Sequence, residues 1–338
     1  MPCTADIPVM KSVEEPGETL AVRELQIAVL IPCFNEAACI AEVVAGFRRV
    51  MPGAVIYVYD NNSADGTADT ARAAGAIVRH EPRQGKGNVI RRMFADIEAD
   101  VYVLVDGDGT YDAGSAPGLV DLLLEDELDM VNAAREEQSE AAYRRGHRFG
   151  NRLLTGIVMH IFGRQLTDML SGYRVLSRRF VKSFPALSVG FETETELTVH
   201  ALELRMPIAE VRTPYRERAA GSTSKLRTYR DGFRILRTIA TLVKEERPLE
   251  SFGAGFVVLA MSSVVLGWPV VSTFVETGLV PRLPTAVLST GLMLLAFLSL
   301  ACGLILDTVT RGRRELRRLH YLQLPLVRSR RGSRRGVE

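Results

Sequence analysis

From residue 26 onward, short apolar runs alternate with segments whose apolar residues recur at helical spacing. The expected strands are residues 26–32, 54–60, 77–80 and 101–106, and the expected helices are 36–50, 68–74 and 87–99. In the first helix, Ile40, Val43, Val44 and Phe47 fall on one face, as in a helix that packs on a sheet. Repetition of strand, helix and strand predicts an α/β domain with a mostly parallel sheet covered by helices.

Two later segments, residues 251–275 and 283–306, contain no charged side chain. Each is long enough to cross about 30 Å of hydrocarbon, which takes roughly 20 helical residues. A pair of buried core helices is the alternative, but such helices rarely run so far without a charge. Because residues 276–282 suit a tight link, the pattern predicts a two-helix transmembrane hairpin.

Basic residues flank both ends of this hairpin. Lys244 and Arg247 precede the first span, and five arginines between positions 311 and 318 follow the second. The positive-inside rule therefore places both ends of the hairpin, and the body before it, in the cytoplasm. We expect an inner- or plasma-membrane protein with both termini cytoplasmic and only the link outside.

The remaining segments have distinct compositions. Residues 226–248 predict a basic amphipathic helix that lies at the membrane surface, with a helix packed on the domain as the alternative. Residues 307–338 form a basic tail suited to anionic lipid headgroups, and no base-reading motif accompanies it, so nucleic acid is not expected as a partner. Residues 1–24 are polar, lack a signal-peptide core and are expected to be flexible, which leaves 25–225 as the main domain.

Composition narrows the class of protein. The chain has 338 residues, of which 47% are hydrophobic and 24% charged, and this excludes a wholly disordered protein. The net charge of +2 hides ten arginines and two glutamates after position 310, so the body is acidic and the tail basic. The four cysteines have no CxxC spacing, which argues against a disulfide framework or a zinc site.

Polar residues follow three of the expected strands, at 32–36, 60–62 and 106–108. Ligands of such sheets bind at the carboxyl ends of the strands. Asp106 and Asp108, in the string DGDGT, are carboxylates one residue apart that can share a hard divalent cation, Mg²⁺ or Mn²⁺, and leave it open to phosphate oxygens. A solvated acidic turn is the alternative, but the two other polar strand ends favour a binding site.

Other nucleotide-binding motifs are absent from the sequence. No GxGxxG follows the first strand and no GxxxxGK[ST] is present, which disfavours a dinucleotide dehydrogenase and a P-loop ATPase. The string QGKG at 84–87 resembles a short phosphate loop, although glycine-rich turns that open helices are common. A helix that begins there could help to hold an anion.

The sequence resembles family 2 glycosyltransferases of the GT-A (Rossmann-like) fold, in particular polyprenyl-phosphate glycosyltransferases related to dolichol-phosphate mannose synthase. The strings that carry the resemblance are IPCFNEA, DNNSADGT, QGKGNVIR, DGDGTY, RFGNRLL, TDMLSGYRVLSR, FETETEL and YRERAAGSTSKL, in that order between residues 31 and 226. The resemblance implies a metal-dependent hexosyltransferase that takes a nucleotide-diphosphate sugar and a polyprenyl phosphate. It also suggests a homo-oligomer, with a tetramer suspected.

The resemblance further implies roles for single residues. The nucleotide sugar would be bound by Pro32, Asn35, Glu36, Asp60, Lys86, Asp106, Gly107 and Asp108, the metal by Asp106 and Asp108, and the acceptor phosphate by Arg135, Arg148, Arg174, Arg218 and Lys225. Asp106, Asp108, Arg135, Arg148 and Asp168 would form the catalytic set, and Ser171 would join Asp168 and Arg174 on the sugar side. Glu36 could instead favour the first turn of its helix, and the assignment of Glu194 to the sugar stays open.

Gly107 and Gly109-Thr110 depart from the pattern of the mannose enzymes, which favours uridine donors carrying glucose or an N-acetylhexosamine. A phosphate acceptor is already an oxyanion, so we expect arginines that align it and no strong general base, with direct displacement inverting the anomeric carbon. The alternatives are an acceptor without a phosphate, a diacylglycerol, ceramide-like lipid or lipid-linked saccharide, with Asp168 as base, or a non-catalytic nucleotide-sugar-binding membrane protein.

Overall fold

The body of the protein is built on a seven-stranded sheet in the order β3-β2-β1-β4-β6-β5-β7. The computed structural model describes residues 25–137, 156, 166–190, 192–216 and 247–326. The strands are β1 (Ile27–Cys33), β2 (Val55–Asp60), β3 (Ile77–His80), β4 (Val101–Leu104), β5 (Met130–Glu137), β6 (Arg174–Ser177) and β7 (Ile208–Tyr215). Among these strands β6 alone runs antiparallel to its neighbours, so the expected mostly parallel sheet is confirmed.

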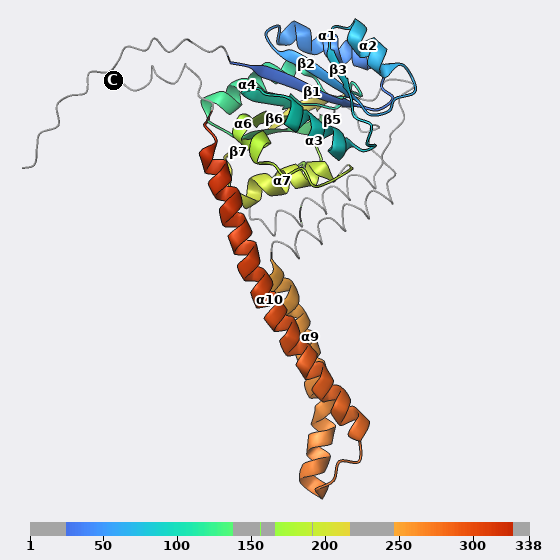
Figure 1. The fold of residues 1–338 in the computed structure, drawn as a ribbon, viewed down its shortest axis with the longest axis vertical. Coiled ribbons are helices and arrows are strands. Elements are labelled where there is room, and N and C mark those ends of the chain that lie inside the picture. Colours follow the sequence, from blue (N-terminus) through green and yellow to red (C-terminus); the bar gives the residue numbers. More distant parts are fainter. Residues whose placement is uncertain (1–24, 138–155, 157–165, 191, 217–246, 327–338) are drawn as a thin grey trace, which may run out of the picture.

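Helices cover both faces of the sheet (Figure 1). They are α1 (Ile40–Val50), α2 (Thr67–Ala73), α3 (Lys86–Asp96), α4 (Ala116–Glu125), α6 (Arg178–Ser183) and α7 (Thr193–Glu203), with a short 3₁₀ turn, η1 (Ala113–Ser115). Successive residues of a strand point to opposite faces. Val29 and Ile31 of β1 therefore pack with α1 and α4, whereas Ala28 and Leu30 pack with α3, α6 and α7.

The first helix begins later than its apolar pattern suggests. We expected it to start at residue 36, but the N–H groups of Cys39 and Ile40 both donate to the carbonyl of Glu36, at 3.0 Å, and close a turn. The helix proper starts at Ile40. Glu36 thus lies in the loop that follows β1 and not in the first turn of α1.

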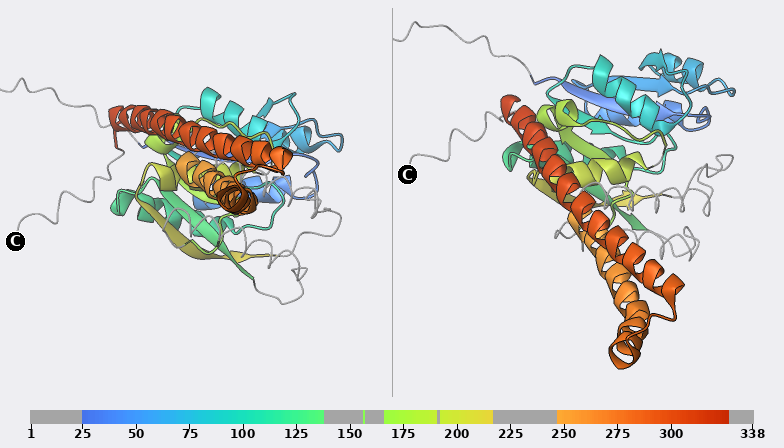
Figure 2. Two further views of the ribbon diagram at one scale, coloured as in Figure 1. Left: turned by 90° about the horizontal axis from the view of Figure 1, so that it is seen from below. Right: turned by 60° about the horizontal axis from the view of Figure 1, so that its bottom comes forward.

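Two long helices follow the body, α9 (Pro248–Thr277) and α10 (Leu283–Gln323). Their most apolar windows have mean hydropathies of 2.0 and 2.3, and only 6% and 11% of those windows is buried. Because core helices of soluble proteins are mostly buried, this exposed apolar surface argues against that alternative. By length and composition both helices can cross a membrane, and they lie side by side as the expected hairpin (Figures 1 and 2).

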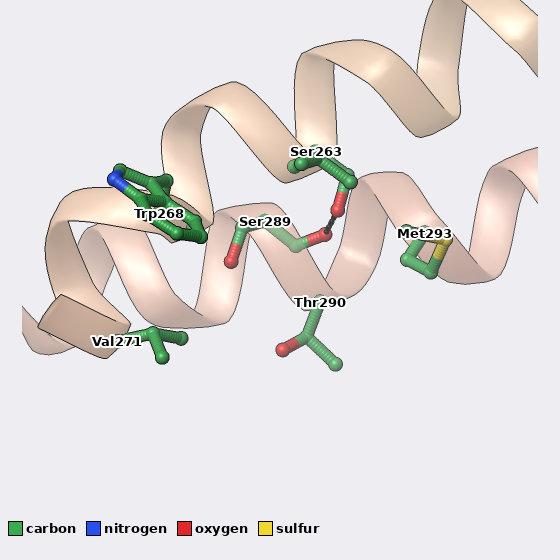
Figure 3. Close-up of a pocket in the computed structure, with 8 residues that line it drawn as sticks. Ser263, Trp268, Val271, Ser289, Thr290 and Met293 are labelled. Atoms are coloured by element: carbon green, nitrogen blue, oxygen red, sulfur yellow. Dashed lines mark hydrogen bonds between the residues drawn. The ribbon is translucent and has the colours of Figure 1, made fainter. Parts of the chain in front are cut away.

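Small residues bring α9 and α10 into close contact. A Cβ added at Gly255 would meet Ser299 Oγ at 3.1 Å, and one at Gly303 would meet the Phe252 side chain at 3.0 Å. Ser263 Oγ donates to the carbonyl of Ser289 at 2.7 Å across the pair (Figure 3). A cavity of about 370 Å³ opens beside this bond and is lined by Val264, Gly267, Trp268, Val271, Thr290 and Met293. Small residues and hydroxyl groups are typical of helix pairs in membranes.

Helix α10 does not end where its apolar run ends. We expected a separate basic tail from residue 307, but the helix continues to Gln323. Its last turns lie against the body of the protein near α6 (Figures 1 and 2), and Tyr321 joins the core on that face of the sheet. The arginines of residues 311–318 therefore belong to a helix that packs on the domain.

The buried histidine of α7, His200, predicts how the stability of the protein depends on pH. The imidazole is buried against Phe180 and Phe184, with ring centroids 5.4 Å apart, and its Nε2 lies 3.1 Å from Ser183 Oγ. Burial, with a smaller effect of Arg317, lowers the pKa of His200 to about 3. The histidine is therefore neutral when folded and takes up a proton on unfolding below pH ~6.5.

Above pH ~6.5 we expect protonation of His200 to cost the folded state nothing. Below that pH the unfolding free energy should fall by about 1.4 kcal/mol per pH unit until the pH reaches the folded pKa. The His200→Gln variant cannot take up this proton, so its unfolding free energy should fall less steeply between pH 7 and 5. Denaturant unfolding in detergent across that range measures both slopes. Parallel curves for the two proteins would show that His200 is not the titrating group.

The expected amphipathic helix at 226–248 lies outside the described residues, except for its last two positions. Residues 1–24 and the end of the basic tail, 327–338, also lie outside them.

Candidate active site

The carboxyl ends of three neighbouring strands meet at one edge of the sheet. Cys33, at the end of β1, pairs with Asp60, at the end of β2. On the other side of β1, strand β4 leads into Asp106 and Asp108. The polar strand ends expected from the sequence are thus brought together, at the edge where α/β sheets bind their ligands.

Asp60 is buried at this edge. Its Oδ2 accepts the N–H of Ser63 at 3.2 Å and lies 3.5 Å from His80 Nδ1. Its Oδ1 has no hydrogen-bond partner among the residues that the structure describes. Because an unsatisfied buried oxygen is costly, this atom is suited to accept a hydrogen bond from a ligand N–H or O–H group.

The loops after β1 and β2 are tied together by side chains. Asn35, with a φ of 53°, donates its N–H to Ser63 Oγ at 2.9 Å and accepts the Ala64 N–H at 2.8 Å. The N–H of Glu36, whose side chain is buried, donates to Thr67 Oγ1 at 2.8 Å. A left-handed φ is one that asparagine tolerates well, so Asn35 can turn the chain sharply at the mouth of the site.

Asn61 organises the turn that carries the QGKG string. Its Nδ2 donates to the carbonyls of Glu81 and Arg83, at 2.7 and 2.8 Å, and its Oδ1 accepts the N–H of Gly85 at 2.7 Å. Gly85 has a φ of 131°, and α3 begins at the next residue. The turn opens a helix, as expected, and places Lys86 at its first position.

Lys86 lies between two carboxylates. Its ammonium group forms ion pairs with Asp106 Oδ1 and with Glu194 Oε1, and the side chain is 10% exposed. Glu194 comes from the first turn of α7 and is itself buried. Residues far apart in the sequence therefore form a cluster of two carboxylates around one cation beside the strand edge.

The electrostatics of this cluster are unusual. Burial, the largest cause, together with the charges of Asp108 and Glu194, raises the pKa of Asp106 to about 6 although Lys86 opposes the shift. Burial opposes the charge on Lys86, but the carboxylates of Asp106 and Glu194 raise its pKa above the usual value. The site thus holds more negative charge than Lys86 alone can neutralise.

Close backbone approaches shape the space around the two aspartates. A Cβ at Gly172 would lie 2.2 Å from Asp106 Oδ2, and a Cβ at Gly107 would lie 2.5 Å from Cys33 Sγ. Asp108 is buried, and its Oδ1 accepts the Thr110 hydroxyl at 2.6 Å and the Thr110 N–H at 3.2 Å. Gly172 of the LSGYR string therefore gives the Asp106 carboxylate room that a side chain would fill, and Gly107 of the DGDGT string lets the backbone between the two aspartates pack on Cys33.

Asp106 and Asp108 offer the hard oxygen donors that Mg²⁺ and Mn²⁺ prefer. In the described part of the chain no group of three or more histidine, cysteine or acidic side chains surrounds one point. The excess negative charge at Asp106 fits a cation, and a site of two carboxylates leaves positions that ligand oxygens can fill. The residues present thus fit a divalent cation shared with a ligand.

Arg135 and Asp168 form a second charged pair. Arg135 Nε and Nη2 donate to the two carboxylate oxygens of Asp168, at 2.7 and 2.8 Å, in a bidentate pair. The guanidinium also lies 5.6 Å from the ring of Tyr215, which packs on Tyr111. Burial raises the pKa of Tyr111, and charges on Arg135, which opposes the shift, and on Asp106 and Asp168 also act on it, so this tyrosine lies within electrostatic reach of both charged clusters.

Comparisons with known proteins identify the family of this chain. The model described as Glycosyl transferase family 2 matches residues 28–184. Glycosyltransferase AglJ from Haloferax volcanii is 34% identical over 229 residues, which cover 68% of this chain and 75% of that protein. The chain belongs to glycosyltransferase family 2. This glycosyltransferase is also 29% identical over 221 residues to a protein named dolichyl-phosphate hexose transferase from Haloferax volcanii, covering 65% of this chain and 95% of the relative.

Solved structures show the same fold. Glucosyl-3-phosphoglycerate synthase from Mycobacterium tuberculosis superposes with a TM-score of 0.54 at 24% identity, and the match covers 64% of this glycosyltransferase and 80% of that chain. A structure of the same synthase contains Mn²⁺, UDP-glucose and glycerol 3-phosphate. The GT-A fold that the sequence motifs implied is thus confirmed.

Arg174 does not lie where the resemblance implied. The side chain is wholly buried, and its guanidinium donates to the carbonyls of Ser171, Met169 and Glu194, at 3.2, 2.6 and 2.9 Å. Burial lowers its pKa to about 10, so the group stays charged at neutral pH. In this glycosyltransferase Arg174 holds the backbone beneath the site and does not face an acceptor phosphate, and Ser171, bonded to the Ala133 carbonyl at 2.5 Å, is likewise internal.

The sequence analysis missed the contacts that hold the loop before α7. Arg91 donates to the carbonyls of residues 186–188, and Glu196 accepts the N–H groups of Leu187 and Ser188 at 2.7 and 2.8 Å. The N–H of Gly87 donates to the Val189 carbonyl at 2.9 Å. This loop thereby fixes the turn around Lys86. The FETETEL string contains Glu196, but its alternating charges gave no indication of a partner.

Of the remaining predicted site residues, Pro32 lies in β1 opposite Tyr59 of β2. Arg148, Arg218 and Lys225 lie outside the described residues. Their assignment to the acceptor stays a prediction.

Proposed function

We propose that this glycosyltransferase transfers a hexose or N-acetylhexosamine from a uridine-diphosphate sugar to a polyprenyl phosphate at the membrane surface. The observation that carries the proposal is the cluster of Lys86, Asp106 and Glu194 beside Asp108, next to the Arg135–Asp168 pair, in a chain with two apolar helices able to span a membrane. The cluster suits a diphosphate leaving group, and the apolar helices suit an acceptor that resides in lipid.

The donor side has to stabilise the negative charge that develops on the departing diphosphate. Lys86 is held in place by two carboxylates and can donate hydrogen bonds to phosphate oxygens as that charge grows. Asp106 and Asp108 would hold a divalent cation, which, when bound, neutralises diphosphate oxygens as a Lewis acid. The unsatisfied Oδ1 of Asp60 and the loop of Asn35 and Glu36 would bind the nucleoside.

The acceptor side favours a phosphate over an alcohol. Both oxygens of Asp168 accept hydrogen bonds from Arg135, so this carboxylate is poorly placed to remove a proton. A phosphate monoester has a second pKa of about 6 and attacks as an oxyanion without a base. Arg135, with Arg148, Arg218 and Lys225 as further candidates, would align it for direct displacement with inversion at the anomeric carbon.

Two comparisons support the choice of substrates. The relative named dolichyl-phosphate hexose transferase supports a polyprenyl-phosphate acceptor, and the synthase of the same fold supports a UDP-sugar with Mn²⁺ or Mg²⁺. We infer that residues 25–225 form the catalytic domain, that residues 226–248 lie at the lipid interface, and that domain and termini are cytoplasmic. We also propose that the protein forms a homo-oligomer, as the resemblance implies, with a tetramer as the expected state.

A substrate screen tests the proposal directly. Purified protein in lipid is offered UDP-glucose, UDP-N-acetylglucosamine and GDP-mannose, each with undecaprenyl or dolichyl phosphate, and the lipid product is identified by mass spectrometry. We expect a polyprenyl-phosphate monosaccharide with a UDP-sugar, dependent on Mg²⁺ or Mn²⁺. Product only with diacylglycerol, ceramide or a lipid-linked saccharide would favour the alternative acceptors, and nucleotide-sugar binding without any product would favour a non-catalytic role.

Paired substitutions distinguish the two classes of acceptor. Asp168→Asn and Arg135→Gln break the same buried ion pair, so they share its structural cost. For a phosphate acceptor, Arg135→Gln should lower kcat/KM for the lipid about tenfold more than Asp168→Asn, because it removes the cation and leaves a carboxylate near the phosphate. The reverse ranking would identify Asp168 as a general base and the acceptor as an alcohol.

A further inference from the structure

The extension of α10 beyond its apolar run has no part in crossing the membrane. The residues from Asp307 to Gln323 would span about 25 Å as a straight helix. They run up the side of the catalytic domain instead of entering solvent, as both views of Figure 2 show. Charged residues that follow a span usually meet only water and headgroups, so the contacts of this extension need an explanation.

The first contact is buried and polar. Tyr321 donates its hydroxyl to Asp129 Oδ2 at 2.5 Å, and Asp129 has no exposed surface. The other oxygen of Asp129 accepts the Ser177 hydroxyl at 2.6 Å and pairs with Arg179, whose guanidinium lies 4.9 Å from the centre of the Tyr321 ring. A ring packed in the core and bonded to a buried carboxylate fixes the position of the helix end.

The second contact lies one helical turn earlier. Arg317 donates to both oxygens of Glu203, at 2.8 and 2.6 Å, and the side chain of Glu203 is only 3% exposed. Arg314 lies 3.9 Å from the same carboxylate. Arg317 and Tyr321 are four residues apart and therefore share one face of α10. This face, and not the whole helix surface, binds the domain.

The two contacts of α10 are made with the end of the domain opposite the active site. Asp129 immediately precedes β5, so it lies at the amino-end edge of the parallel strands. Glu203 is the last residue of α7, whereas Glu194, which pairs with Lys86, stands in the first turn of that helix, about 14 Å away along its axis. The two ends of helix α7 thus contact α10 and the Lys86 cluster of the active site, so a single helix connects them.

We propose that the Asp307–Gln323 extension is a strut that sets the height and tilt of the active site above the bilayer, with Arg317 and Tyr321 as its positioning residues. The argument rests on the lipid-phosphate acceptor of the proposed function. The tail of such an acceptor confines its phosphate to the headgroup plane, so the domain has to present the donor at one height. A misplacement of about 1 Å can cost as much as 10²-fold in rate.

The test compares an acceptor in a bilayer with one free in solution. The triple variant Glu203→Gln, Arg317→Gln and Tyr321→Phe removes the polar contacts of both residues, and Asp129 keeps Arg179 as its partner. Arg318→Gln makes the same substitution as Arg317→Gln at an exposed neighbouring position and is the control for the loss of an arginine from α10. The triple variant itself keeps the net charge, because Glu203→Gln and Arg317→Gln cancel. Transfer is measured to undecaprenyl phosphate in proteoliposomes and to a water-soluble phosphate of two isoprene units in detergent.

We expect the triple variant to lose about tenfold or more in the bilayer and less than about twofold with the soluble acceptor, while the control keeps both rates. If the triple variant lost transfer activity equally with both acceptors, or lost none with either, the strut proposal would be wrong. An independent readout is energy transfer from a fluorophore on Asp69→Cys, an exposed position of α2, to labelled lipids. An unchanged transfer efficiency in the triple variant also refutes the strut, whereas a wild-type protein inactive with both acceptors refutes only the proposed function.

Discussion

The Asp108→Asn variant is expected to lose about 10²–10³-fold in kcat and to bind Mn²⁺ much more weakly than the wild type. Asparagine keeps the shape of the side chain and an oxygen that can accept the Thr110 hydroxyl, now at 2.6 Å from Asp108, so the local fold should persist. It removes one of the two negative charges that would hold the cation, and the loss of one preorganised electrostatic contact typically costs this much. Turnover with saturating UDP-sugar and Mn²⁺ titration of the protein measure the two effects.

Asp121→Asn is the matched control for that experiment. Asp121 is an exposed carboxylate on α4, and the same change there should leave both turnover and Mn²⁺ affinity as they are in the wild type. If Asp108→Asn kept wild-type Mn²⁺ affinity, Asp108 would be removed from the proposed metal site. If it kept turnover in the presence of a chelator, metal dependence itself would be wrong.

The positions of Asp60, Asp106 and Asp108 could be predicted because they depend on short-range patterns. Asp60 ends, and Asp106 and Asp108 follow, a short apolar run typical of a buried strand, and parallel strands carry their carboxyl ends to one edge. The presence of two apolar helices was predictable for the same reason, since a run without charge is a local property, although the end of α10 at Gln323 was not. Nothing beyond nearest neighbours was needed for either result.

The roles of Glu194 and Arg174 could not be read in the same way. Glu194 pairs with Lys86 from a helix more than a hundred positions away, and its string of alternating acidic residues has no period that indicates a buried face. Arg174 stands in a family string, but whether it faces a ligand depends on the carbonyls that surround it in the folded chain. Pairing and burial of charge are tertiary properties, because an isolated arginine is stable only in water or among such acceptors.

The contacts of the α10 extension with the domain could not be predicted from the sequence either. Five arginines after the second apolar run predicted a basic tail that meets anionic lipid headgroups. The two residues that bind the domain, Arg317 and Tyr321, are marked only by their spacing of four. Spacing alone indicates a shared face and says nothing of what that face contacts.

The Lys86→Met variant is expected to lower transfer by about 10²–10³-fold, because the departing diphosphate loses a cation in a buried site. It also leaves Asp106 and Glu194 without their shared counter-charge, so its unfolding free energy should fall by about 3–5 kcal/mol. Both effects follow from one ammonium group, and a single variant cannot separate them. Turnover and denaturant unfolding therefore have to be measured together.

A second substitution separates chemistry from stability at Lys86. In Lys86→Met with Glu194→Gln, one of the two buried charges is gone, so most of the lost stability should return. Transfer should stay as low as in Lys86→Met, because the cation that faces the diphosphate is still missing. Lys86→Arg, which keeps the charge, should retain more activity than either. If the double variant recovered transfer together with stability, Lys86 would serve only to balance Asp106 and Glu194, and the leaving group would have to be stabilised by other residues.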